Sequence, residues 1–184
     1  MCQLMKLRLI LCCVLGLLFW SMTSCDSGFK RDGIRYTIQA DGLVVMPTQV
    51  KEYVGDIKIP DSVVYHGKKY AVLKISTGAF ENCKLLKSVV IPATVKEIGS
   101  NAFAQCLGLQ VIHCRVEAPV AIDSTTFEGV SLNKCVLSVP LQMAKSYANA
   151  PYWNQFSIYE EGEVVDLTTL PATAVAIKVD DHGE

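Results

Sequence analysis

The side chains best suited to chemistry in this 184-residue chain are eight cysteines and three histidines. The histidines are His66, His113 and His182, and none has a partner at the HxxxH or HExxH spacing of a metal site. No cysteine pair has the CxxC spacing of a zinc site, and the GxSxG, GxxxxGK[ST] and GxGxxG motifs are absent from the sequence. We therefore expect no metal, no cofactor and no catalytic residues, and the chain is not expected to be an enzyme.

Cys114 and His113 come closest to a nucleophile and its base, because they are neighbours in the chain. They fall in an expected strand, where adjacent side chains point to opposite faces, so they cannot share a proton. Cys114 also takes the place that Ile91 has one repeat earlier. We therefore expect Cys114 to be a core residue.

The other cysteines of the expected folded part are interpreted in the same way. Cys83 and Cys106 occupy equivalent repeat positions and are expected to be buried free thiols. A disulfide between Cys114 and Cys135 is the alternative, because an oxidising compartment permits it and both residues fall beside neighbouring strands.

Composition excludes several classes of protein. Half of the residues are hydrophobic (51%) and the net charge is −1, which argues against a strongly basic nucleic-acid binder and against wholesale disorder. The charge is divided along the chain: residues 30–159 hold 14 basic and 10 acidic side chains, and residues 160–184 hold seven acidic and one basic. A solvated surface explains this division without a polyanion partner.

The N-terminal segment, residues 1–24, has the pattern of a secretory signal. Lys6 and Arg8 precede an apolar run over residues 9–20, whose twelve residues would rise about 18 Å as a helix, too short for a bilayer core of about 30 Å. The run ends in Ser-Met-Thr-Ser before Cys25, which resembles a bacterial lipobox. We expect residues 1–24 to be a lipoprotein signal peptide and 25–28 a linker lipidated at Cys25, placing the protein at the outer membrane, facing outward. Secretion with a free Cys25 is the alternative.

An internal repeat organises the middle of the chain. Residues 75–86 align with 98–109, with identical residues at five of the twelve positions, and Phe127 follows Phe103 at nearly the same spacing as Phe103 follows Phe80. A second template, a strand that ends at a proline, recurs at 57–63, 89–95 and 137–143. Each unit is too small to bury its own apolar side, so we expect the units to stack, strand on strand and phenylalanine on phenylalanine.

The first two copies of the proline template lie further apart than one repeat period, and the extra segment is interpreted as an inserted hairpin. Its strands would be Val64–Tyr65 and Tyr70–Val72, around a turn at 66–69.

The phrase Ile-Pro-x-x-Val-x-x-Ile-Gly-x-x-Ala-Phe-x-x-Cys-x-x-Leu, complete from Ile91 to Leu109, resembles the BspA-type leucine-rich repeat. The resemblance covers positions 29–159 and implies a β-rich, right-handed leucine-rich-repeat solenoid. About three repeats are expected, each of about 23–24 residues. The resemblance also implies a bacterial surface protein, since members of the family are often lipoproteins and several act as adhesins.

Such a stack needs closed ends. Ile34–Ile38 and Leu43–Val45, around Asp41-Gly42, predict an N-terminal β-hairpin cap, and residues 141–150 predict a short C-terminal helix. An aromatic group then follows, which we expect to fill the last core layer; a sugar-stacking platform is the alternative. The group is Tyr152, Trp153, Phe156 and Tyr159.

The acidic tail, residues 160–184, contains one alternating segment at 173–179, followed by a turn pattern at 180–183. We expect either a strand that docks on the cap or the stub of a truncated small domain.

The strand phase predicts which side chains face outward. An outer row of Lys58, Val90, His113 and Ser138 is expected, with Asp56, Ser88, Val111 and Val136 beside it. This mixed surface suits contact with a protein. The sequence thus predicts a lipid-anchored surface or adhesion module that recognises a protein or host matrix, with a membrane contact only through its lipid and no nucleic-acid partner. A structural accessory lipoprotein within an envelope assembly, without an external ligand, is the alternative.

Overall fold

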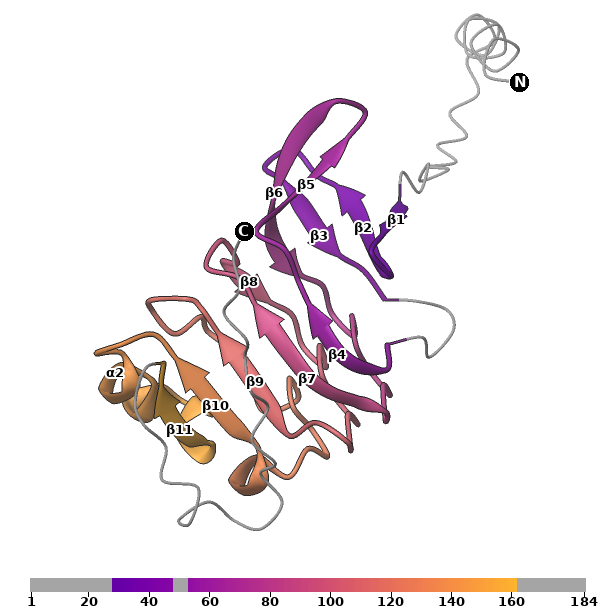
Figure 1. Cartoon of the computed structure of the whole chain (residues 1–184). Helices are drawn as coiled ribbons and strands as arrows, with labels where there is room; N and C mark the ends of the chain where they lie inside the picture. The colour runs from indigo at the N-terminus through magenta and orange to yellow at the C-terminus, as the bar shows by residue number, and fades with distance from the viewer. Residues whose placement is uncertain (1–27, 48–52, 162–184) are drawn as a thin grey trace, which may run out of the picture.

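The computed structural model describes residues 28–47 and 53–161, which form two β-sheets (Figure 1). The first sheet has the order β1-β2-β3-β6-β5, with β8 paired to β6. Its strands are β1 Phe29–Arg31, β2 Ile34–Ile38, β3 Leu43–Val45, β5 Ser62–Tyr65, β6 Lys68–Ile75 and β8 Glu97–Ile98. The second sheet has the order β11-β10-β9-β7-β4. Its strands are β4 Gly55–Lys58, β7 Leu86–Ile91, β9 Val111–Cys114, β10 Val136–Val139 and β11 Ser157–Glu160.

All neighbouring strands of the second sheet are parallel, so the chain returns to the same end of the sheet before each new strand. Pro60, Pro92 and Pro140 follow β4, β7 and β10, where the missing N–H of proline ends the ladder. Figure 1 shows the five strands side by side along the molecule. The recurring strand and proline pattern therefore sets where β4, β7 and β10 stop, whereas β9 and β11 end without a proline.

A stack of phenylalanine rings runs through the core behind this sheet. The Phe80 and Phe103 rings are 5.1 Å apart with an interplanar angle of 2°, and Phe103 and Phe127 are 5.2 Å apart at 6°. All three side chains are buried. Burial of each ring contributes about 1.5–3 kcal/mol. The expected stacking of the repeats, phenylalanine on phenylalanine, is confirmed.

The turns after these phenylalanines are joined by backbone hydrogen bonds from one repeat to the next. The N–H of Phe80 donates to the carbonyl of Ala102 (2.7 Å), and the N–H of Phe103 to the carbonyl of Thr126 (2.8 Å). Two positions later, Gln105 donates to Glu128 (2.7 Å) in the same way. The polar backbone of the turns is thus satisfied between repeats.

Both expected hairpins are present. β2 and β3 pair antiparallel from Tyr36–Val45 to Ile38–Leu43, around the predicted Asp41-Gly42 turn. β5 and β6 pair from Ser62 to Tyr65 with a turn made only of His66 and Gly67, at φ of 49° and 75°. Positive φ at both turn positions suits the right-handed twist of so short a hairpin. The turn is therefore shorter than the expected 66–69.

The C-terminal end contains the helix α2 (Ala144–Asn149) and two 3-10 turns, Leu132–Lys134 and Trp153–Gln155. The Trp153 indole lies 5.7 Å from the Phe127 ring and donates its N–H to the carbonyl of Val120 (2.8 Å). Phe156 also packs on Phe127, at 5.1 Å. These two rings fill the last core layer, whereas Tyr152 is exposed. Tyr159 lies instead on β11, a strand that the sequence analysis did not anticipate.

Several sequence-based expectations lie outside the described residues. They are the signal peptide at 1–24, the lipidation site Cys25, and the strand and turn of the tail at 173–183.

Candidate binding face

The parallel register brings the four expected outer residues into one row. Lys58 pairs with Val90, Val90 with His113, and His113 with Ser138, across β4, β7, β9 and β10. β11 extends this row by Tyr159, which pairs with Ser138. Lys58 is exposed and the other members are half-buried. The four residues therefore lie together as expected, and Tyr159 is a fifth member.

A second row lies beside the first, two positions earlier on each strand. It joins Asp56, Ser88, Val111 and Val136 and ends at Ser157. The Ser88 hydroxyl donates to Oδ1 of Asp56 (2.7 Å). We call the two rows together the outer face: Asp56, Lys58, Ser88, Val90, Val111, His113, Val136, Ser138, Ser157 and Tyr159.

The residues between the rows point into the core. Val89, Ile112 and Leu137 have no exposed surface. Ile57 differs, since it is only partly buried at the edge strand β4. The alternation of a parallel strand with one solvated side thus holds along β9 and β10, whereas on β7 the outer-row residue Ser88 is also buried.

His113 is the titratable group at the centre of the outer face. Burial lowers its pKa below the usual value, and the nearby Arg115 guanidinium lowers it further, against the opposing charges of Glu161 and Asp56. The imidazole is therefore neutral at pH 7, with a donor and an acceptor nitrogen. Such a group suits hydrogen bonding to a partner.

Cys114, next to His113, faces the core. Its Sγ lies 3.2 Å from the Tyr147 hydroxyl, and that hydroxyl donates to the carbonyl of Val116 (2.7 Å). Since the tyrosine proton is used there, the thiol donates to the tyrosine oxygen. The expected separation of His113 and Cys114 onto opposite faces is confirmed.

The four cysteines of the described residues are free and buried: Cys83, Cys106, Cys114 and Cys135. Burial raises the pKa of Cys106 and of Cys135 to about 12 and raises that of the other two thiols. The thiolate is the reactive form, so these side chains are poor nucleophiles at neutral pH. The alternative Cys114–Cys135 disulfide is not formed.

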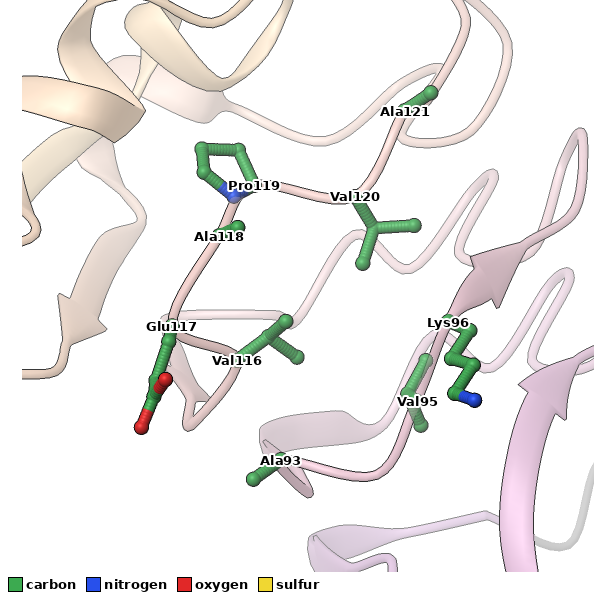
Figure 2. Close-up of a pocket in the computed structure, with 9 residues that line it drawn as sticks. All are labelled: Ala93, Val95, Lys96, Val116, Glu117, Ala118, Pro119, Val120 and Ala121. Carbon is green, nitrogen blue, oxygen red and sulfur yellow. The ribbon is translucent and has the colours of Figure 1, made fainter.

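A shallow hollow of about 660 Å³ opens where β7 and β9 end. Figure 2 shows Val116 and Val120 on one side, Ala93 and Val95 on the other, and Glu117 and Lys96 at opposite ends of the lining. Its lining is mostly small and apolar. This hollow could not be predicted from the sequence, because residues 115–121 follow neither repeat template.

Residues 28–47 and 53–161 contain no group of three or more histidine, cysteine or acidic side chains placed to hold a metal ion. In the same residues no helix has the length and apolar character needed to cross a bilayer.

Comparison with known families agrees with the repeat architecture. The family model for the BspA type leucine rich repeat region matches residues 73–161 in six copies. Residues 73–161 are a BspA-type leucine-rich repeat region. The family model counts six copies in this region, whereas the sequence pattern predicts about three repeats, so the two counts differ. The outer face lies mostly within this BspA-type region, and only its β4 residues precede it.

Solved structures that the chain resembles are also leucine-rich. The first is a leucine rich cell surface protein from Faecalibacterium prausnitzii, with 22% identity, a TM-score of 0.44, and coverage of 72% of this chain and 29% of that one. The second is a leucine-rich repeat protein from Bacteroides capillosus, with 20% identity, a TM-score of 0.44, and coverage of 74% and 99%. A third, from Bacteroides ovatus, has 22% identity, a TM-score of 0.44, and coverage of 72% and 33%. This chain thus spans under a third of the first protein. No curated protein matches the sequence significantly.

Proposed function

We propose that the protein is a lipid-anchored module of the cell surface that binds another protein or host matrix through its outer face. The observation that carries this proposal is the single row of Lys58, Val90, His113 and Ser138 across four parallel strands. The row combines a cation, an apolar side chain, a neutral imidazole and a hydroxyl. A surface of this kind can bury apolar area and form hydrogen bonds with a protein.

The architecture that presents this face is a right-handed solenoid whose repeats, with their caps, span positions 29–159. The β2–β3 hairpin serves as the N-terminal cap, and α2 with Trp153 and Phe156 serves as the C-terminal cap. The caps would keep the apolar ends of the stack from water, as repeat proteins require. In support, Trp153 and Phe156 both pack on the last phenylalanine of the stack.

The anchor is the acylated Cys25, which becomes the N-terminal residue when residues 1–24 are cleaved off. The basic residues and short apolar run before Cys25 support this assignment. Several acyl chains would each bury many methylenes, at about 0.8 kcal/mol per methylene, so attachment would be stable.

Binding can be tested with residues 25–184 carrying Cys25→Ser, which removes the acylation site. This soluble protein is used to capture partners from host matrix proteins and from bacterial surface extracts. Val90→Glu and His113→Glu should each weaken capture of an identified partner while leaving the circular dichroism spectrum unchanged. The matched control is Val64→Glu, because Val64 is exposed on the inserted hairpin (53%), away from the outer face. Equal capture of the partner by the parent protein and by the Val90→Glu, His113→Glu and Val64→Glu variants would contradict the proposal.

A structural accessory lipoprotein within an envelope assembly is the second candidate, favoured by the small extent of the repeat region. Protease treatment of intact cells distinguishes the two. Loss of the protein supports a surface role, and complete protection supports the internal one.

A further inference from the structure

Part of the outer face is apolar. Val111 and Val136 are paired across β9 and β10, and Val90 on β7 lies diagonal to Val111, opposite His113. Each of the three valines is only half-buried. Covering these half-buried aliphatic side chains would remove further apolar area from water, which is favourable. The same face carries the cation Lys58 at its β4 edge.

The chain leaves the sheet beside this face. β11 ends at Glu160, and the N–H of Glu161 donates to the carbonyl of Val139 on β10 (2.8 Å). Glu161, the last described residue, therefore lies at the carboxyl edge of the parallel strands. Five strands spaced about 4.8 Å apart are about 19 Å wide, and a fully extended segment as long as residues 162–184 reaches about 75 Å. The tail has ample length to cross the whole face.

The charges of the two parts are opposite. Residues 162–184 carry one lysine and five carboxylates, Glu163, Asp166, Asp180, Asp181 and Glu184. Residues 30–159 carry four more basic than acidic side chains. Attraction between the tail and the body therefore favours an intramolecular contact, at an effective concentration that no separate partner has.

The apolar pattern of the tail also fits. Val175, Ile177 and Val179 alternate with Ala176 and Lys178, so an extended tail presents three aliphatic side chains on one side. These can cover the valines of the outer face. The adjacent Asp180 and Asp181 would then be free to meet Lys58 on β4 or Arg115 near His113.

We propose that residues 162–184 lie across the outer face and cover Val90, Val111 and Val136. The tail then competes with any partner for this surface, so partner binding requires its displacement. This contact does not depend on the proposed function, because it is defined without an external ligand.

The test measures how fast a thiol at the face reacts. Val90→Cys is introduced into residues 25–184 carrying Cys25→Ser, and labelling by a maleimide is followed by mass spectrometry of peptides. The native thiols of the described residues are buried, so the new thiol reacts selectively. A second protein carries the same changes and amides in place of the five tail carboxylates. We expect the thiol at position 90 of this second protein to label about fivefold faster, the effect of losing a few surface ion pairs. About 1 M sodium chloride, where the screening length is about 3 Å, should also speed up labelling at position 90 of the protein that keeps its five tail carboxylates.

Val64→Cys provides the control position, since it lies on the inserted hairpin and not on the outer face. Its labelling rate should be the same with either tail. Equal rates at position 90 with either tail would overturn the proposal, as would protection at position 90 that disappears on dilution, which would assign the cover to a second copy. A partner can still bind the face in either of those cases, so failure here is distinct from failure of the proposed function.

Discussion

Gly129 lies directly over Gln105 of the preceding repeat, at the same left-handed corner. The φ angles are 81° at Gly129, 58° at Gln105 and 62° at Asn82, one repeat earlier again. A Cβ on Gly129 would lie 2.7 Å from Nε2 of Gln105. The corner thus demands a positive φ in every repeat, and three different residue types meet that demand.

Replacement at this corner should change stability in opposite directions. Gln105→Gly should stabilise the fold by up to about 1 kcal/mol, and Gly129→Ala should destabilise it by about 1–2 kcal/mol, because a side chain at positive φ is strained. Urea unfolding measures both. The Gln105 amide can move away from a new methyl group, so Gln105→Ala combined with Gly129→Ala should recover little. Full recovery in the double variant would show that the side-chain clash, and not the backbone, carries the cost.

Phe103 occupies the middle of the ring stack and contacts a ring on each side. Phe103→Ala should reduce the free energy of unfolding by about 3–5 kcal/mol, from lost burial and the cavity left behind. Since a whole domain has about 5–15 kcal/mol, this variant should be largely unfolded under mild denaturant. Phe103→Leu, which keeps most of the volume, should retain the fold. A loss below about 1 kcal/mol for Phe103→Ala would contradict the role of the stack.

Much of the fold could be predicted from the sequence because the repeat constrains several positions at once. Ala79, Phe80, Cys83 and Leu86 return as the same residue types at 102–109, and each of them faces the same core. The period therefore predicts both the stacking of Phe80 on Phe103 and the phase of the strands. That phase then predicted the outer row of Lys58, Val90 and His113. The confirmation is geometric, and the binding role of the row stays a prediction.

The remaining features depend on contacts that no repeat position encodes. β11 is a strand because Ser157–Glu160 pairs with β10, although its sequence lacks the proline template. The hollow depends on how the irregular loop from Val116 to Ala121 lies against the turn after β7. The left-handed corner was missed because Asn82, Gln105 and Gly129 share a backbone conformation but not a residue type.

Two buried tyrosines should respond differently to loss of their hydroxyl groups. The hydroxyl of Tyr36 is buried and has no hydrogen-bond partner in the part of the chain that the structure describes. The hydroxyl of Tyr147 bonds to both Cys114 and Val116. Tyr147→Phe should cost about 1–2 kcal/mol, because it leaves a buried carbonyl and thiol without their partner, whereas Tyr36→Phe should be neutral or stabilising. Thermal unfolding of the pair tests this contrast. Equal losses would show that Tyr36 also has a partner, such as ordered water.

Asp123 makes stability depend on acid pH. Its carboxylate accepts hydrogen bonds from the Ser100 hydroxyl and from both the hydroxyl and the backbone N–H of Thr125, which lower its pKa to about 2. A carboxyl whose folded pKa lies below its unfolded value contributes stability above the unfolded pKa, near 4, and loses that contribution as the pH falls towards 2. The melting temperature of the native chain should therefore fall between pH 4 and 2 more steeply than that of Asp123→Asn, which has no proton to gain there. Ser100→Ala removes the largest cause of the shift, so its acid transition should move to higher pH. Parallel curves for the native chain and Asp123→Asn would show that this carboxylate is hydrogen-bonded no better in the folded chain than in the unfolded one.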